Sequence, residues 1–458
     1  MDMTLQEAVS ARQEELLRTL QESIRIRSVQ APAEEGCPYG PGVRRCLDHA
    51  LETARGLGLK AVDMDHQAGW CEYGEGEEMV AVLGHLDVVP EGDGWSFDPF
   101  GGEIRDGKVF GRGSMDDKGP TVAALYALAA IRDAGLPLRR RIRLLLGTNE
   151  ETGSQDMKYY RAHGGELPVM GFTPDGEYPV INGEKGIVNM TFRRTYAQSG
   201  AVRIKRIGGG SAPNVVPAHA RAEIVCPPEL AEQWMAAPAE KLRVSETADG
   251  MLVEAEGVSA HGASPQEGEN ALGRLVRALT ALPLAEDAGA AVRFLAEKLG
   301  METDGAALGA ALRDEVSGPL TLNWGTLEGD DTSLSLTVNF RYPVTKTYED
   351  CGPAVRAAFE GAGFTLEREV HKPCLYIPQS SELVQTLLRV YAEKTGLPAA
   401  PKSIGGGTYA KAIPNVVAFG PIFPGDEVRE HKPDEFIEVD KLMKNAQIIA
   451  EAMYQLAK

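Results

Sequence analysis

The order of apolar segments predicts an α/β protein, with a first domain built as a sandwich around a mainly parallel sheet. Residues 80–83 and 141–146 are short apolar runs, which are typical of strands buried on both faces. Residues 121–131 lie between them, are rich in Ala and Leu, and predict a helix. Since strands and helices alternate in this way up to Asp175, parallel strand pairing is favoured.

A change of pattern at residues 184–187 predicts a domain boundary. The region that follows mixes short strands with helices, which indicates an α+β insert. Its expected strands are 187–193, 202–207, 218–226, 252–257, 320–326, 333–340 and 365–371, and its expected helices are 270–281, 285–299 and 348–360. Gly208–Gly210 is interpreted as a loop. From Leu375 the first pattern returns, so we expect a first domain of residues 1–185 and 374–458, interrupted by residues 186–373.

Composition narrows the class of partner and the compartment. The 458-residue chain has 66 acidic and 47 basic residues and a net charge of −19, which argues against nucleic acid or an anionic membrane as partner. No apolar stretch approaches the roughly 20 residues that a bilayer-spanning helix needs. The six cysteines show no Cys-x-x-Cys spacing and are expected to be reduced thiols. Since residues 1–24 are charged and unlike a signal peptide, we expect a cytoplasmic protein.

Three polar clusters follow or closely precede the predicted strands and helix. They are Gly-His-Leu-Asp at 84–87, Gly-Arg-Gly-Ser-Met-Asp-Asp-Lys-Gly-Pro at 111–120, and Thr-Asn-Glu-Glu-Thr-Gly-Ser at 148–154. A hairpin signal at 103–110, Asp-Gly between alternating residues, leads into the second cluster. Their acidic and imidazole groups therefore lie where strands end and helices begin. In an open α/β sheet this edge is where ligands bind.

These residue types suit metal ions, because carboxylates can bridge two ions and zinc accepts both imidazole nitrogen and carboxylate oxygen. His85 and Asp87 lie two apart and point to one face of a strand, so one can bind metal while the other accepts the ring N–H. Glu150 and Glu151 diverge, so one can bind metal while the other faces a bound water. Each cluster alone has an ordinary explanation, such as a solvated pair or an acidic helix N-terminus. The three together favour metal chemistry.

A family resemblance is carried by residues 84–90, Gly-His-Leu-Asp-Val-Val-Pro, which precede Gly-Asp-Gly-Trp at 92–95 and Asp-Pro-Phe at 98–100. This sequence resembles the two-metal aminopeptidase, carboxypeptidase and acylase superfamily, and within it the bacterial dipeptidases of the PepV type. Residues 111–120 and 149–154 are similar to the next two signatures of that superfamily. Further matching segments recur at Asp175, Asn214, His261, Arg341, Gly405 and His431. The resemblance therefore covers nearly the whole chain.

The resemblance implies a set of metal ligands in which Asp116 bridges two divalent ions. His85 and Asp175 would complete the shell of one ion, and Glu151 and His431 that of the other. Without the resemblance, Asp175 reads equally well as a turn residue before glycine, and His431 as an exposed loop histidine. Zinc is the expected metal, and manganese or cobalt would also suit these ligands.

The resemblance also implies the catalytic roles. Asp87 would orient His85, and Asp117 would support the bridging Asp116. Two ions activate a water molecule and clamp the substrate carbonyl in such sites. Glu150 would be the general base, which takes the proton of the water and passes it to the leaving amine.

For the insert, the resemblance implies a lid domain that contacts substrate. His261 would stabilise the oxyanion, and Asn214 would offer a second polar contact. Arg341 could clamp a free C-terminal carboxylate bidentately, and the backbone N–H groups around Gly406 and Gly407 could help. The ordinary alternatives are a turn histidine, an asparagine in a Pro-rich turn, and an exposed arginine at a strand end.

The favoured function is therefore a two-metal dipeptidase that acts on dipeptides and short peptides. The alternative is an amidohydrolase of the same fold acting on N-acyl amino acids, which would not receive a free α-amine. An inactive scaffolding protein would have lost Glu150 or a ligand, and a phosphohydrolase would need a basic phosphate cradle; neither feature is found. Because the insert is longer than the single lid of dimeric relatives, we expect it to hold a second lobe in the partner's place. A monomer is the resulting expectation.

Overall fold

The computed structural model describes residues 3–237 and 239–458, so residues 1, 2 and 238 of the predicted domains lie outside the described residues. Contacts within the chain divide it into two compact units. Unit 1 comprises the residues up to Asn182, Ile377–Lys402 and Gly407–Lys458. Unit 2 comprises Gly183–Tyr376 and Ser403–Gly406.

The sheet of unit 1 is parallel at its centre. Strand β3 (Met79–His85) pairs in parallel with β6 (Arg141–Gly147) and β7 (Met170–Thr173), and β7 pairs in parallel with β22 (Val416–Ala418). At one edge, β2 (Ala68–Tyr73) is antiparallel to β6 and to β1 (Lys60–Met64). At the other side, β9 (Ile181–Glu184) begins antiparallel to β22. The predicted α/β class is confirmed, with a sheet that is mixed because its flanking strands are antiparallel.

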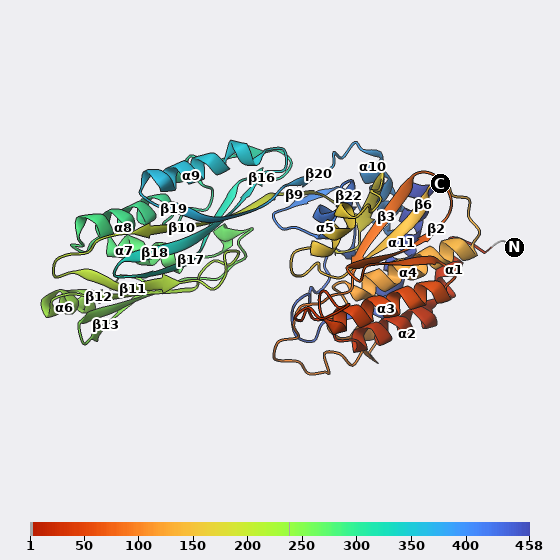
Figure 1. Ribbon diagram of the computed structural model, residues 1–458, viewed down its shortest axis with the longest axis horizontal. Coiled ribbons are helices and arrows are strands. Elements are labelled where there is room, and N and C mark those ends of the chain that lie inside the picture. The colour runs from red at the N-terminus through yellow and green to blue at the C-terminus, as the bar shows by residue number, and fades with distance from the viewer. Residues whose placement is uncertain (1–2, 238) are drawn as a thin grey trace. The chain divides into compact units, whose positions relative to one another are not determined.

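Helices of unit 1 pack on this sheet and on one another (Figure 1). They are α1 (Leu5–Ser10), α2 (Gln13–Arg25), α3 (Pro41–Gly56), α4 (Lys118–Asp133), α5 (Gln155–Ala162), α10 (Glu382–Thr395) and α11 (Val439–Ala457). Helix α4 packs against α11, and both contact β3. Every residue of α4 from Lys118 to Ile131 is buried, because Ala and Leu cover the helix on all sides. The buried α4 supports the loop that precedes it, which carries the second polar cluster.

A small antiparallel sheet leads the chain into that loop. Strands β4 (Glu103–Arg105) and β5 (Lys108–Phe110) form the predicted hairpin. Asp106 and Gly107 at its turn both have positive φ, 49° and 73°, which an Asp-Gly pair accommodates. Strand β24 (Phe436–Glu438) then pairs with β5, so that Phe436 lies opposite Phe110. Two segments that are far apart in sequence are thereby brought side by side just before the second polar cluster. Two further short strands, β8 (Gly176–Glu177) and β23 (Pro421–Ile422), pair in parallel.

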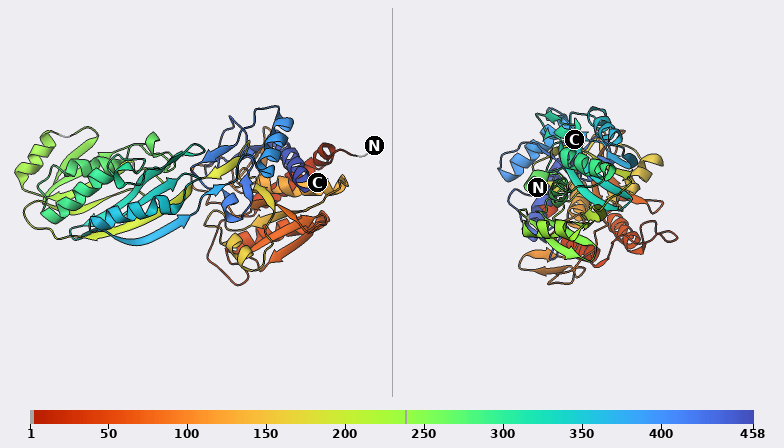
Figure 2. Two further views of the ribbon diagram at one scale, coloured as in Figure 1. Left: turned by 90° about the horizontal axis from the view of Figure 1, so that it is seen from above. Right: turned by 90° about the vertical axis from the view of Figure 1, so that its left-hand side faces the viewer.

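Unit 2 is an antiparallel sheet of eight strands with helices on one face (Figures 1 and 2). The strand order is β13 (Leu242–Thr247), β14 (Gly250–Glu256), β12 (His219–Val225), β11 (Arg203–Gly209), β17 (Thr321–Asp330), β18 (Ser333–Tyr342), β10 (Gly186–Thr195), β19 (Thr365–Lys372). The covering helices are α6 (Pro228–Ala236), α7 (Ala271–Leu279), α8 (Glu286–Lys298) and α9 (Gly352–Gly361). In the core between the layers, Phe192 of β10 stacks on Phe359 of α9 at 4.0 Å between ring centroids. Short strands β15 (Arg313–Asp314) and β16 (Gly318–Pro319) pair with each other, whereas β20 (Leu375–Tyr376) and β21 (Lys402–Ile404) pair with β9.

Three sequence-based expectations for the insert differ from the structure. The predicted loop at Gly208–Gly210 is wrong, because Gly208 and Gly209 end strand β11. A side chain at Gly209 would bring its Cβ within 2.7 Å of the His219 carbonyl oxygen, so glycine permits close approach of β12 there. The single helix expected at 348–360 is a 3₁₀ turn at Tyr348–Asp350 followed by α9. Helix α6 and strand β13 were not anticipated, because half-exposed residues give them little apolar periodicity.

Among the described residues, no helix combines the length and the apolar character that crossing a bilayer requires.

Candidate metal centre and catalytic groups

Adjacent parallel strands bring the polar clusters of unit 1 together. His85 is the last residue of β3, Glu150 and Glu151 follow the end of β6, and Asp175 follows the end of β7. Because the carboxyl ends of parallel neighbours meet at one edge of a sheet, these side chains converge from separate parts of the sequence. Asp116 reaches the same place from the loop between β5 and α4.

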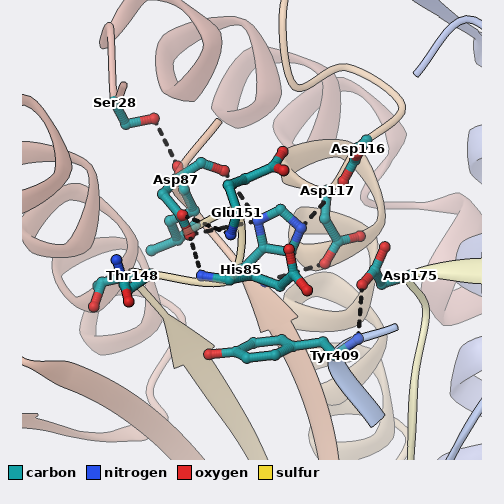
Figure 3. A network of polar contacts seen from close by, with 12 residues as sticks. Ser28, His85, Asp87, Asp116, Asp117, Thr148, Glu151, Asp175 and Tyr409 are labelled. Atoms are coloured by element: carbon teal, nitrogen blue, oxygen red, sulfur yellow. Dashed lines mark hydrogen bonds and ion pairs between the residues drawn. The ribbon is translucent and has the colours of Figure 1, made fainter. Parts of the chain in front are cut away.

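Two groups of possible ligand atoms overlap at Asp116. Figure 3 shows His85, Asp116 and Asp175 of the first group. His85, Asp116 and Asp175 form one group, and Asp116, Glu151 and His431 form the other; within each, the atoms lie within 4.8 Å of one another. Asp116 Oδ1 lies 3.1 Å from His85 Nε2, and Asp116 Oδ2 lies 3.0 Å from His431 Nε2. His431 Nε2 also lies 3.3 Å from Glu151 Oε2. One carboxylate thus faces both groups, as a bridging ligand must.

The donor set fits two divalent cations. The carboxylates of Asp116, Asp175 and Glu151 gather there with that of Glu150. All four are partly or fully buried, so their mutual repulsion and their loss of solvation are costly without compensating positive charge. Glu151 Oε1 and Asp117 Oδ1 are buried atoms without a hydrogen-bond partner within the described residues. Imidazole nitrogen and carboxylate oxygen are ligands that zinc and manganese accept. The five residues predicted as ligands therefore stand together, and their metal-binding role stays a prediction.

Electrostatics at the cluster favour positive charge. Burial would raise the pKa of Asp116, but hydrogen bonds from His431 and His85 outweigh it and hold that pKa below its usual value. Hydrogen bonds to Asp116 and Glu151 raise the pKa of His431 to about 11. Burial and the charge of Asp116 raise the pKa of Asp175 to about 6. The carboxylates therefore stabilise any cation placed among them.

Glu150 stands beside the two groups without belonging to either. Burial, followed by the negative charge of Asp175, raises the pKa of Glu150 well above its usual value. Its backbone N–H donates to Asp87 Oδ1 at 3.1 Å, and the N–H of Glu151 donates to Asp87 Oδ2 at 3.1 Å. The buried Asp87 carboxylate thus fixes the turn that presents both glutamates.

For His85, the nearest acceptor on Asp87 is its main chain. His85 Nδ1 lies 2.9 Å from the Asp87 carbonyl oxygen and 3.6 Å from Asp87 Oδ1. Asp117 is fully buried, and its Oδ2 accepts the His85 backbone N–H at 3.1 Å and the Thr121 hydroxyl at 3.0 Å. The Asp116–Asp117 peptide bond is cis. Asp117 therefore binds the backbone N–H of His85, and the Asp87 carbonyl binds its ring nitrogen. The predicted roles of Asp87 and Asp117 stay predictions.

Tyr409 is a site residue that sequence reasoning missed. Its backbone N–H donates to Asp175 Oδ2 at 3.1 Å, and its ring meets the His85 imidazole edge-on with centroids 5.9 Å apart (Figure 3). Its hydroxyl donates to the buried Asp156 Oδ2 at 2.5 Å. A Cβ at Gly147 would lie 2.1 Å from that hydroxyl, so glycine at the end of β6 makes room for the ring. No local signal in the sequence links Tyr409 to Asp156.

Unit 2 carries the other predicted site residues except Gly407. Asn214 and His261 are neighbours, since the Gly262 N–H donates to the Asn214 carbonyl at 2.7 Å and Val215 pairs with His261. Arg341 is buried and donates to the Gly405 carbonyl at 2.5 Å and to Asn339 Oδ1 at 3.3 Å. Burial alone lowers the pKa of Arg341 to about 10, and no carboxylate of the described residues forms an ion pair with it. Gly406 belongs to unit 2, and Gly407 to unit 1.

Comparison with known proteins adds a family. The model of the family described as Peptidase family M20/M25/M40 matches residues 81–455. A protein of Bacillus subtilis (strain 168) named "Putative dipeptidase YtjP" is 39% identical over 468 aligned residues, which cover 98% of this chain and 99% of that protein. A similarly named dipeptidase of Staphylococcus aureus (strain USA300) is 33% identical over 466 residues and 98% of both chains.

Solved structures share the fold. Human carnosine dipeptidase 1 is 16% identical with a TM-score of 0.59, covering 99% of this chain and 98% of that chain. The aminoacylhistidine dipeptidase of Vibrio alginolyticus is 14% identical with a TM-score of 0.60, covering 97% and 96%. At this identity the likeness shows the fold alone.

Metal binding should stabilise the protein through Asp116. After chelation, added Mn²⁺ or Zn²⁺ should raise the midpoint of thermal unfolding, because an ion that binds only the folded state at 100 times its Kd contributes about 2.7 kcal/mol. Asp116→Asn should lose most of this rise, since Asp116 belongs to both groups. Asp106→Asn, at a hairpin turn where the side chain is 91% exposed, is the matched control and should keep it. An undiminished rise in Asp116→Asn would rule out the shared ligand.

Proposed function

This chain belongs to the peptidase family M20/M25/M40, and we propose that it is a metal-dependent dipeptidase that cleaves dipeptides and short peptides with two divalent ions. The observation that carries the proposal is the single carboxylate of Asp116 shared by two ligand groups, with Glu150 beside them. The names of the dipeptidase relatives support the substrate class. The donor set suits zinc, manganese or cobalt, and zinc remains the first expectation.

In the proposed reaction, His85, Asp116 and Asp175 would hold one ion, and Asp116, Glu151 and His431 would hold the other. When bound, the ions lower the pKa of a water and polarise the scissile carbonyl. Glu150 accepts the proton of the attacking water on its carboxylate and donates it to the leaving amine nitrogen. One observation supports this role: Glu150 lies beside the two ligand groups but belongs to neither, so its carboxylate is free to act on the water.

Residues of unit 2 would bind the substrate. Arg341 is a buried cation without a carboxylate partner in the described part of the chain, and a free C-terminal carboxylate would satisfy it. His261 would donate to the carbonyl oxygen of the scissile bond; burial and the Arg341 charge lower its pKa, which favours a neutral imidazole donor. Asn214 and the backbone N–H groups of Gly406 and Gly407 would add polar contacts.

A deacylase acting on N-acyl amino acids is the second candidate, because its product carboxylate would also need Arg341. The two activities differ in whether the substrate has a free α-amine. A screen of free dipeptides against their N-acetylated forms, with added Mn²⁺, Zn²⁺ or Co²⁺, separates them. We propose the dipeptidase because the curated relatives carry that name.

We also propose that the protein acts in the cytoplasm, without nucleic acid or membrane partners.

The general base can be tested by Glu150→Ala. This variant should bind both ions, while turnover of a dipeptide should fall by about two to four orders of magnitude, the usual contribution of general acid–base catalysis. The adjacent Glu151→Ala is the matched contrast and should lose metal, because Glu151 belongs to a ligand group. Metal content and turnover are measured on the same preparations. Lost ions or near-normal turnover in Glu150→Ala would contradict the assignment.

The carboxylate clamp can be tested by Arg341→Met, which keeps much of the side-chain volume. Hydrolysis of dipeptides should fall severely, whereas hydrolysis of the same dipeptides with an amidated C-terminus should change little. The comparison of kcat/KM for the two substrates isolates the carboxylate contact. Equal losses on both would mean that Arg341 has a structural role.

The proposed monomer can be tested by mixing two inactive variants, Glu150→Ala and His261→Ala. We expect no recovery, because residues 203–256 build half of the strands of the unit 2 sheet within one chain, and His261 follows them in the same unit. Activity is measured at concentrations at which a dimer would exchange subunits. Recovered activity would demonstrate that His261 of one chain serves the site of another, and the monomer would be wrong.

A further inference from the structure

The Glu435 side chain is fully buried beneath the loop that carries Asp116. Its Oε1 accepts three backbone N–H groups, from Met115 at 2.9 Å and from Gly113 and Asp116 at 3.1 Å each. Its Oε2 accepts from Arg112 Nη1 at 2.6 Å. One carboxylate therefore satisfies three backbone donors of a tight loop that has no strand or helix partner of its own.

Arg112 holds Glu435 in this position. Its side chain is also buried, its Nη2 donates to the Glu91 carbonyl at 3.3 Å, and its guanidinium lies 5.2 Å from the Trp95 ring centroid. An ion pair of this kind, with both charges desolvated, keeps its geometry because displacement of either partner leaves an unpaired buried charge.

The main chain adds to the connection. The Gly111 N–H donates to the Glu435 carbonyl at 2.9 Å, immediately before Phe436 pairs with Phe110. Glu435 also lies close to His431 in the sequence, with only Lys432, Pro433 and Asp434 between them. The same short segment therefore carries one side chain of the second ligand group and the support for the residue shared by both groups.

We propose that Glu435 is a positioning residue, which with Arg112 fixes the loop of Asp116 so that each Asp116 carboxylate oxygen faces one metal ion. The inference rests on the proposed function for the presence of the ions, but not for any step of the reaction. A bridging carboxylate has to place two oxygens at once, so a small tilt of its loop loses both contacts. Groups that orient metal ligands are typically worth 10- to 100-fold in metal affinity.

The proposal is tested by metal titration of Glu435→Gln. The amide is nearly isosteric, but one end presents N–H donors either to Arg112 or to the loop, so the loop loses its support. Affinity for both Mn²⁺ ions should fall by about 10- to 100-fold. KM for a dipeptide, measured with both ions saturating, should stay unchanged, because no substrate contact is altered.

The matched control is Glu438→Gln. Glu438 ends the same short strand β24, and it pairs with Lys441 at 3.1 Å instead of contacting the loop. This variant should bind both ions as the wild type does. Asp175→Asn provides the opposite contrast, since it should weaken one ion more than the other.

If Glu435→Gln does not fold, Arg112→Gln serves as the second variant. It retains the Glu435 carboxylate and its three backbone donors and removes the guanidinium with its contacts to Glu435, Glu91 and Trp95, so a smaller loss of affinity for both ions is expected. Circular dichroism establishes folding before either titration. Wild-type affinity for both ions in a folded variant, or a loss confined to one ion, would overturn the positioning role.

The titration also separates this inference from the proposed function. If the wild type itself bound no divalent ions, the metal-dependent function and the inference would both fail. If the wild type bound two ions and folded Glu435→Gln bound them equally well, the positioning role alone would fail.

Discussion

The Asp116 carboxylate is the interaction on which the rest of the candidate centre depends. Its two oxygens face His85 and His431, which come from the first strand of the parallel core and from a loop near the end of the chain. Without this shared group, the remaining ligands would form two incomplete sets. The position of the Asp116 side chain therefore decides whether the two groups are complete.

The other carboxylates of the candidate centre are held mostly by main-chain N–H groups. Asp87 accepts the N–H groups of Glu150 and Glu151, Asp117 accepts that of His85, and Tyr409 donates its own N–H to Asp175. A buried carboxylate that is hydrogen-bonded to backbone amides resists rearrangement, because every lost bond leaves a desolvated donor. The candidate site thus gains rigidity from Asp87 and Asp117, two acidic residues outside both ligand groups. This support matters because the five predicted ligands lie on separate segments of the chain.

Much of this architecture could be predicted from sequence. The apolar runs before His85, Glu150 and Asp175 identified three strands of the core, and glycine-flanked polar clusters identified the edge where they meet. The confirmed family resemblance supplied His431, for which local pattern offered only an exposed loop. Local sequence patterns are sufficient to predict a site residue where its strand and turn are next to it in the chain.

The remaining features depend on contacts between distant segments. Hydrogen bonds join Glu435 to the Asp116 loop, and Tyr409 to Asp156. The spacing of apolar residues in the sequence does not predict either contact. The burial of Arg341 at the end of β18 is likewise set by packing, so its sequence reads as an ordinary strand end. Gly208 and Gly209 were misassigned to a loop because close approach of β12 overrides the low strand preference of glycine. Each of these features was missed or misassigned because it depends on contacts between segments that are distant in the sequence.

The interleaving of the two units along the chain has a consequence for synthesis on the ribosome. Unit 2 is continuous from Gly183 to Tyr376 apart from Ser403–Gly406, so nearly all of it can fold while later residues are still being added. Unit 1 has to wait for β22, β24 and α11, and with them for His431 and Glu435. A nascent chain therefore carries only one of the two ligand groups until its closing segment emerges. Assembly of the candidate centre is thus a late event in synthesis, because His431 of the second ligand group is added only after unit 2 is nearly complete.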